Sequence, residues 1–314
     1  MRVLLTGATG FVGRHTIPLL TARGHAVRAA LRIPQDGPWE QAAVGDIGPG
    51  TDWTAALAGI DAVIHMAARV HVMRDKSADP LAEFRRVNTA GTIRLAEQAA
   101  AAGVKRFVFL SSIKAMVDES RPAPLDEETV PDPHSPYGIS KLEAERGLAA
   151  ISVRTGMEVA VLRPPLVYGP GAAGNMRALV KLVDTGLPLP LGGIHNRRSL
   201  IYVGNLADAV VTVLEHPDAG GQTFLVQDGE PVSTADLVRS IAEALGRPAR
   251  LLPVPRGLLA LGAALTGTRA VFDRLAGTLT VDDAPIRERL GWRPPHDLAS
   301  GLRATAEWFK ASRG

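Results

Sequence analysis

The chain has 314 residues, 46% of them apolar and 21% charged, which is typical of a soluble globular protein with a sizeable core. It contains no cysteine, which excludes disulfides, zinc–thiolate sites and cysteine nucleophiles. The eight histidines lack the spacing of two metal ligands on one helix, so we expect no metal site. The 35 basic and 32 acidic residues leave a net charge of only +3, which does not favour nucleic-acid binding.

The N-terminal segment predicts a strand, a phosphate-binding turn and a helix. An apolar run ends at Thr6, glycines follow at positions 7, 10 and 13, and an amphipathic pattern continues to about Ala22. In such a turn Gly7 permits the sharp bend, Gly10 lets the backbone approach a pyrophosphate, and Gly13 lets the helix pack closely on the strand. The helix N-terminus then offers unpaired N–H groups to an anion. The segment therefore predicts a dinucleotide site.

Strands and helices alternate through the first half of the chain. The predicted strands are 26–31, 61–68, 106–111 and 159–163, and the predicted helices between them are 80–102 and 136–155. This order is typical of an α/β fold with a Rossmann-like, doubly wound parallel sheet.

The alternation ends after Pro164, where proline and glycine become frequent. Runs at 199–203 and 223–227 resemble strands that return to a sheet. We expect a dinucleotide-binding domain of residues 1–165 and a smaller, mainly substrate-binding domain of residues 166–314. Segments near 199–215 are expected to return to the first domain.

The localisation follows from the absence of targeting patterns. The chain enters a strand at once, with no signal peptide, which predicts a cytoplasmic protein. The apolar segment 257–265 is too short to span a bilayer, so we expect a buried helix there and no membrane insertion.

A phenol and an ammonium group lie four residues apart at Tyr137 and Lys141, on one face of a predicted helix. The preceding strand ends near Ser112, and parallel strands gather their C-terminal ends where ligands bind. A hydroxyl, a phenol and an ammonium would then converge beside a nicotinamide. This set suits proton transfer at a carbinol, because a neighbouring ammonium and an oxidised nicotinamide are both expected to lower the phenol pKa.

The glycine turn TGATGFVG, the serine twenty-five positions before Tyr137 and the YxxxK pair together resemble the extended short-chain dehydrogenase/reductase family, of the NAD-dependent epimerase/dehydratase type. The resemblance covers essentially the whole chain. It implies an NAD(P)-dependent enzyme whose catalytic residues are Ser112, Tyr137 and Lys141.

The turn and the resemblance together imply cofactor contacts from the turn, the following strand ends and the catalytic helix. These residues are Gly7, Thr9, Gly10, Phe11, Val12, Gly13, Arg14, Arg32, Asp46, Ile47, Met66, Ala67, Ala68, Asn88, Tyr137, Lys141 and Pro164. The resemblance also implies that Ser112, Asn175 and Arg198 bind the substrate, the last two resembling contacts to a UDP-sugar pyrophosphate. It further implies a homodimer formed by helices 92–102 and 137–149.

Within the family the chain looks most like nucleotide-sugar 4-epimerases and 4-keto-sugar reductases, on local cues at 70–73 and 110–115. Sugar dehydratases place acidic residues directly after the catalytic hydroxyl, where this chain has Ile113 and Lys114, so dehydration is disfavoured.

The second predicted strand bears on the choice of cofactor. It ends in Arg32 rather than in the acidic residue of NAD-preferring folds, and Arg14 follows the glycines. Two guanidinium groups favour a 2′-phosphate, so NADP(H) is expected, with NAD(H) as the alternative, since Asp36 could still reach a ribose.

An NADP preference predicts a reductase of a UDP-4-keto-6-deoxy-hexosamine, acting in surface polysaccharide synthesis. The alternative is a 4-epimerase of UDP-glucose or UDP-N-acetylglucosamine. A reductase of a non-sugar ketone and a cofactor-sensing protein without turnover are further alternatives.

Overall fold

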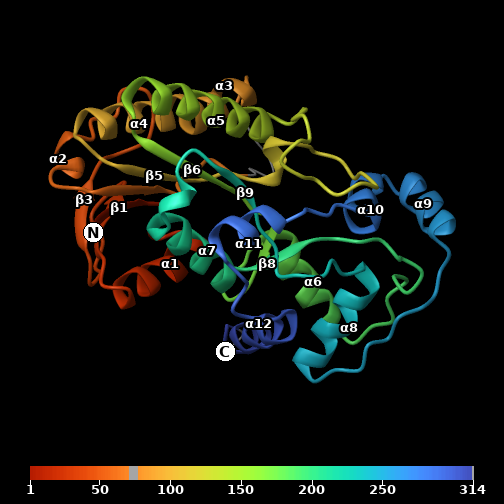
Figure 1. Ribbon diagram of the computed structural model, residues 1–314. Helices are drawn as coiled ribbons and strands as arrows, with labels where there is room; N and C mark the ends of the chain where they lie inside the picture. The colour runs from red at the N-terminus through yellow and green to blue at the C-terminus, as the bar shows by residue number, and fades with distance from the viewer. Residues whose placement is uncertain (71–76, 313–314) are drawn as a thin grey trace.

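A seven-stranded parallel sheet forms the centre of the molecule, as the computed structural model shows for residues 1–70 and 77–312 (Figure 1). Its strands are β1 Arg2–Thr6, β2 Ala26–Leu31, β3 Glu40–Ala43, β4 Ala62–His65, β5 Arg106–Leu110, β6 Glu158–Arg163 and β9 Thr223–Leu225. The strand order is β3-β2-β1-β4-β5-β6-β9, and every neighbouring pair is parallel. The predicted doubly wound fold is therefore confirmed. The order reverses direction between β1 and β4, which is where such folds bind ligands.

Helices cover both faces of the sheet (Figure 1). One face carries α2 Thr54–Leu57, α4 Gly91–Ala101 and α5 Pro136–Thr155, and the other carries α1 Phe11–Ala22, α7 Val203–Glu215 and α11 Ala284–Leu290. Side chains alternate along β1, so Leu4 packs into the core under α4 and α5, while Val3 and Leu5 pack into the core under α1 and α7. Such strands are buried on both faces, which explains their continuous apolar sequence.

Several helices from the second half of the chain surround a second hydrophobic core. They are α6 Gly174–Asp184, α8 Thr234–Leu245, α9 Arg256–Leu265, α10 Arg269–Ala276 and α12 Leu298–Ala311. Beside them, β7 Leu166–Tyr168 and β8 Leu200–Tyr202 form a separate two-stranded parallel sheet. The division of the chain into domains at residue 165 remains a prediction.

The two runs predicted to return to the sheet behave differently. Residues 223–225 form β9 and join the large sheet beside β6, as expected. Residues 200–202 also form a strand, β8, which pairs with β7 in the small sheet and not with the large one. The helix that follows, α7, does lie against the large sheet and packs on α1.

Two predicted helices also differ from the structure. The helix expected over residues 80–102 is interrupted by a π-helical turn at Arg85–Ala90, between α3 Pro80–Phe84 and α4. The apolar helix α9, expected to be buried, is mostly exposed, and Ala263 is its only buried residue. No helix in the described part of the chain is long and apolar enough to cross a membrane.

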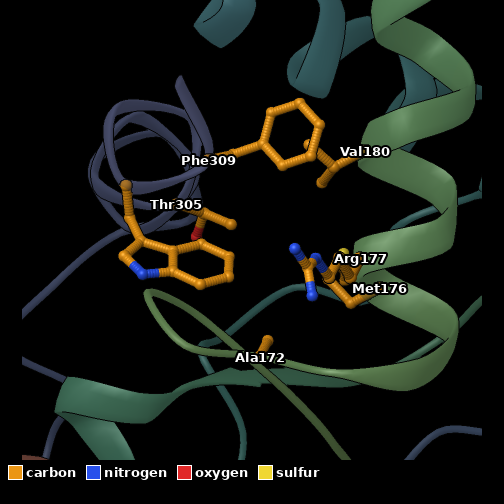
Figure 2. Close-up of a pocket in the computed structure, with 7 residues that line it drawn as sticks. Ala172, Met176, Arg177, Val180, Thr305 and Phe309 are labelled. Carbon is orange, nitrogen blue, oxygen red and sulfur yellow. The ribbon is translucent and has the colours of Figure 1, made fainter. Parts of the chain in front are cut away.

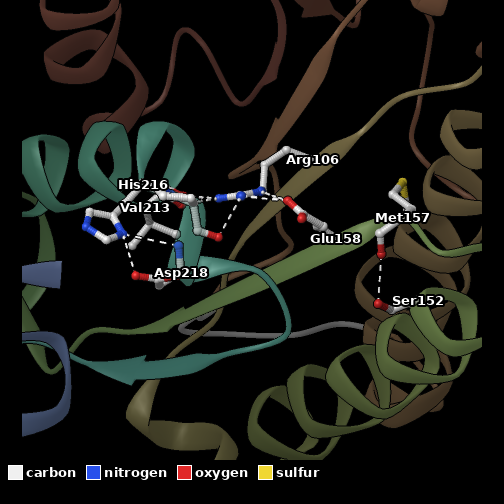
Figure 3. Close-up of polar contacts among 8 residues, drawn as sticks. Arg106, Ser152, Met157, Glu158, Val213, His216 and Asp218 are labelled. Atoms are coloured by element: carbon white, nitrogen blue, oxygen red, sulfur yellow. Dashed lines mark hydrogen bonds and ion pairs between the residues drawn. The ribbon is translucent and has the colours of Figure 1, made fainter. Parts of the chain in front are cut away.

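A buried arginine, Arg106, connects β5 to β6 and to the end of α7 (Figure 3). Arg106, at the start of β5, forms an ion pair with Glu158 of β6 at 2.6 Å. It also donates hydrogen bonds to the carbonyl oxygens of Val213 and His216 at 2.8 and 2.9 Å. These carbonyls end α7 and have no partner within the helix, so Arg106 caps α7 and ties it to two strands.

Candidate active site

The turn between β1 and α1 has the geometry of a phosphate cradle. Gly7 adopts a φ of 74°, and its carbonyl oxygen accepts a hydrogen bond from the Gly10 nitrogen at 2.9 Å. A Cβ atom at Gly13 would lie 2.2 Å from the Gly7 oxygen, so only glycine allows this close packing. Gly10 is the N-cap of α1 and has no side chain to cap the first N–H groups. These groups suit the pyrophosphate of a dinucleotide.

Three buried polar side chains support the floor of this turn. The Thr6 hydroxyl accepts hydrogen bonds from the backbone nitrogens of Met66 and Ala67 at 3.2 and 3.1 Å. The His65 ring bonds the Thr6 hydroxyl through Nδ1 at 2.6 Å and the Thr92 hydroxyl through Nε2 at 2.8 Å. Burial lowers the pKa of His65 to about 3, so the ring is neutral and joins β1, β4 and α4.

The residues Met66–Ala68 therefore lie next to Gly7, as predicted for a strand end under the cofactor, and a Cβ on Gly7 would come within 2.8 Å of the Ala67 nitrogen. Sequence reasoning missed Thr6, His65 and Thr92. The available signal was a histidine inside an apolar strand, since a buried polar side chain requires partners.

The three predicted catalytic residues come together at the C-terminal end of β5. Tyr137 and Lys141 lie one turn apart on α5, and Ser112 follows β5 and forms a hydrogen bond with Tyr137. The Lys141 ammonium is buried, donates to the Leu110 carbonyl at 2.8 Å, and lies 4.3 Å from the centre of the Phe109 ring.

Burial sets the protonation of this group. It raises the pKa of Tyr137 to about 12, although the hydrogen bond with Ser112 acts in the opposite direction. It lowers the pKa of Lys141 to about 7, while the charge of Glu145 acts in the opposite direction. Burial thus outweighs the hydrogen bond to Ser112 in setting the Tyr137 pKa, and the predicted lowering by Lys141 together with an oxidised nicotinamide stays a prediction.

A buried ion pair lies one turn beyond Lys141 on α5 and was not predicted. The Glu145 carboxylate accepts hydrogen bonds from the Ser111 hydroxyl and from Arg163 of β6, whose Nε lies at 3.1 Å. The Glu145 and Arg163 side chains are only 7% and 11% exposed. The pair thus joins α5 to the ends of β5 and β6 directly behind the catalytic residues.

Asn88 connects the loop after β4 to the catalytic helix. Its Oδ1 accepts from the Arg69 nitrogen at 2.7 Å, and its Nδ2 donates to the Arg69 carbonyl and to the Ser140 hydroxyl, each at 3.0 Å. The Ser140 hydroxyl donates in turn to the Tyr137 carbonyl. Asn88 was predicted as a cofactor contact, and its amide hydrogens are used within the protein. Asn88, within the π-helical turn, thus links the loop after β4 to α5, and its contact with a cofactor stays a prediction.

Arg32 and Asp46, predicted for the adenosine end of the cofactor, form an ion pair with each other. The Arg32 Nε lies 2.6 Å from the Asp46 carboxylate, at the ends of β2 and β3, and both side chains are exposed. Ile47 packs against α4, where a Cβ on Gly91 would come within 2.6 Å of it. Arg14 is exposed on the first turn of α1.

The other predicted cofactor residues lie in the β1–α1 turn, at the start of α1 and after β6. Thr9, Phe11 and Val12 are partly buried in the turn and at the start of α1. The carbonyl oxygen of Pro164 accepts a hydrogen bond from the Ile113 nitrogen at 3.1 Å, which fixes the segment after β6 beside Ser112.

The two predicted pyrophosphate contacts lie on different elements. Asn175 is exposed near the start of α6. Arg198 precedes β8. Its guanidinium donates hydrogen bonds to the carbonyl oxygens of Arg274, within α10, and of Gly277, directly after α10. Burial lowers the pKa of Arg198. Their common role in substrate binding stays a prediction.

Side chains of α6 and α12 line a small pocket between the two helices (Figure 2). Val180 lies beside Phe309, Met176 lies beside Arg177, and the Arg177 guanidinium lies 5.8 Å from the centre of the Trp308 ring. This cation–π contact joins α6 to α12.

A family model described as "NAD dependent epimerase/dehydratase family" matches residues 3–226. The chain belongs to this family. It is therefore an enzyme of the extended short-chain dehydrogenase/reductase type, as its motifs predicted.

Similar proteins include enzymes with different substrates. A "UDP-glucose 4-epimerase" of Vibrio cholerae is 46% identical, covering 98% of this chain and 95% of that protein. A "3-beta-hydroxysteroid dehydrogenase" of Mycolicibacterium neoaurum is 33% identical, covering 78% of this chain and 70% of that protein. The solved structure of "MoeE5 in complex with UDP-glucose and NAD" superposes with a TM-score of 0.78 at 29% identity, covering the whole of both chains.

Proposed function

We propose that this enzyme is a UDP-hexose 4-epimerase. The observation that carries the proposal is the 46% identity, over 98% of the chain, to a protein described as a UDP-glucose 4-epimerase. The convergence of Ser112, Tyr137 and Lys141 supports it, because a 4-epimerase needs one proton-transfer group beside the sugar C4 hydroxyl.

In the proposed reaction Tyr137 takes the proton from the C4 hydroxyl and later returns it, and Ser112 donates a hydrogen bond to the same oxygen. Lys141 holds positive charge behind the phenol and favours its ionised form when substrate is bound. The nicotinamide, when bound, supplies hydride acceptance and return at C4. The glycine turn and the floor formed by Met66–Ala68 are the residues that would hold it.

The epimerase was the alternative in the sequence-based prediction, and the comparisons favour it over the reductase. A reductase consumes one reduced cofactor per turnover, whereas an epimerase leaves the cofactor unchanged. The relative described as a steroid dehydrogenase supports a non-sugar ketone as a second candidate substrate, at lower identity and coverage.

The decisive experiment incubates the enzyme with UDP-glucose or UDP-N-acetylglucosamine and separates the C4 epimers. We expect interconversion without net change in nicotinamide absorbance, and a loss of about 10²–10⁴-fold in kcat for Tyr137→Phe. Tyr168→Phe is the matched control, since that phenol is buried beside Tyr202 instead. Stoichiometric NADPH consumption with a UDP-4-keto sugar, and no epimer formation, would restore the reductase.

We further propose that the cofactor is NAD(H) rather than the NADP(H) predicted from Arg14 and Arg32. The ion pair with Asp46 supports this, because the carboxylate occupies the Arg32 guanidinium and would repel a 2′-phosphate. We expect wild type to bind NAD⁺ more tightly than NADP⁺, and Asp46→Asn to raise NADP⁺ affinity by up to about tenfold. Calorimetry with both nucleotides measures this. An unchanged NADP⁺ affinity in the variant would show that Arg32 lies away from the ribose.

A further inference from the structure

Apolar side chains are exposed along α9 and on both sides of it. Leu258, Leu261 and Leu265 are 61%, 58% and 80% exposed, and their spacing puts them on one face of the helix. Leu252 before the helix and Val271 after it are also exposed. We call these five residues the α9 apolar face. Exposed apolar side chains concentrated in one segment are typical of an interaction site rather than of a folding core.

The charge around this face differs from that of the rest of the molecule. Residues 246–276 contain five arginines and one aspartate, a net charge of +4, whereas the whole chain carries +3, so the remainder has a net charge of −1. Asp273 pairs with Arg269, and Asp184 of α6 pairs with Arg247. Arg250 and Arg256 lie exposed beside the apolar face.

This combination decides between the possible occupants. A second copy related by two-fold symmetry would bring the same positive segment against itself, which repels. An anionic lipid surface accepts both features, because apolar side chains enter the headgroup boundary and arginines meet phosphates. A helix of ten residues is about 15 Å long, so α9 would lie along a bilayer and not span it.

We propose that the α9 apolar face docks this protein on an anionic lipid bilayer. The position of α9 at the outer edge of the molecule, away from the large sheet, leaves the face accessible (Figure 1). The face contains none of the residues assigned to the cofactor or to proton transfer, so docking and catalysis are separable.

The test is co-sedimentation of the protein with vesicles. One set contains phosphatidylcholine alone, and the other also contains about one third phosphatidylglycerol. We expect binding to the anionic vesicles only, with loss when salt rises from about 0.1 M to about 1 M and the Debye length falls from about 10 Å to about 3 Å.

Three variants examine the two halves of the proposal. Leu258→Ser/Leu261→Ser/Leu265→Ser should weaken binding about tenfold or more, and Arg250→Glu/Arg256→Glu should do the same. Val153→Ser, which changes an exposed side chain on α5, is the matched control and should bind like wild type. Cofactor binding by each variant verifies that it is folded.

Two results would overturn the proposal. One is the absence of binding to anionic vesicles by a folded wild-type protein at low salt. The other is an oligomer in light scattering that the triple leucine variant loses, since this would make a second copy the occupant of the face.

Discussion

Two influences of opposite sign set the pKa of Lys141. Burial lowers it, and the carboxylate of Glu145 raises it. The groups that face it are Tyr137 and Glu145 on its own helix and His65 on β4, and the neutral ring of His65 provides no countercharge. Glu145 in turn is neutralised by Arg163. The pKa of Lys141 therefore depends on a carboxylate whose own hydrogen bonds go to Ser111 and Arg163.

Removing this carboxylate gives the first prediction at the residue scale. Glu145→Gln should lower the pKa of Lys141 further below about 7, since the charge of Glu145 raises it. Lys141 would then lose its proton at lower pH, and the decline of kcat with rising pH should move to lower pH. The pH profile of kcat between about pH 5.5 and 9 measures this displacement.

The control for this variant is Glu143→Gln, on the same helix, where the carboxylate pairs with the half-exposed Arg85 and does not reach Lys141. Glu145→Gln should also cost about 3–5 kcal/mol of unfolding free energy, because Arg163 loses its buried partner. A folded Glu145→Gln enzyme with an unmoved pH profile would contradict the coupling to Lys141.

At the scale of elements, the β1–α1 turn depends on the close approach of two backbone segments. Gly13→Ala would place a methyl group 2.2 Å from the Gly7 oxygen and 2.9 Å from the Ala8 carbonyl oxygen. Neither backbone atom can move without opening the turn. We expect a loss of about 1–3 kcal/mol in stability and of most dinucleotide affinity, measured by thermal unfolding and NAD⁺ titration.

Gly50→Ala is the matched control, because a Cβ there meets no atom within 4 Å. It should leave both measurements unchanged. Tight NAD⁺ binding by Gly13→Ala would place the pyrophosphate elsewhere than at this turn.

The elements also show where pattern reading succeeds. β1, α1, β2 and α5 begin and end within about a residue of their predictions, because each has an unbroken apolar period and a clear end signal such as Gly24 or Gly156. The π-helical turn before α4 was not predicted, because one extra residue in a turn leaves no mark in composition. α9 was expected to be buried because its sequence is apolar. This expectation failed because an apolar sequence does not determine whether another part of the protein covers the helix.

At the scale of the whole molecule, the resemblance to the family predicts a homodimer through α4 and α5. The structure is compatible with this, since α5 leaves small side chains such as Ala149 and Ala150 exposed while Gly147 packs against Ile93 of α4. Light scattering at micromolar concentration should give twice the 33.1 kDa mass of one chain. Ala150→Glu should give monomers, whereas a monomeric wild type would contradict the prediction.

The sequence by itself determined most of the sheet, the glycine turn and the three residues that come together at the C-terminal end of β5, because local periodicity and short spacings specify them. Only the tertiary structure decided how Lys141 is charged, since Glu145, Arg163 and Ser111 come from three elements. The same holds for the Arg32–Asp46 pair and for the exposure of α9. Each of these depends on which segments pack together. The protonation of a side chain is set by its burial and by charged residues far away in sequence, and a local sequence pattern contains neither.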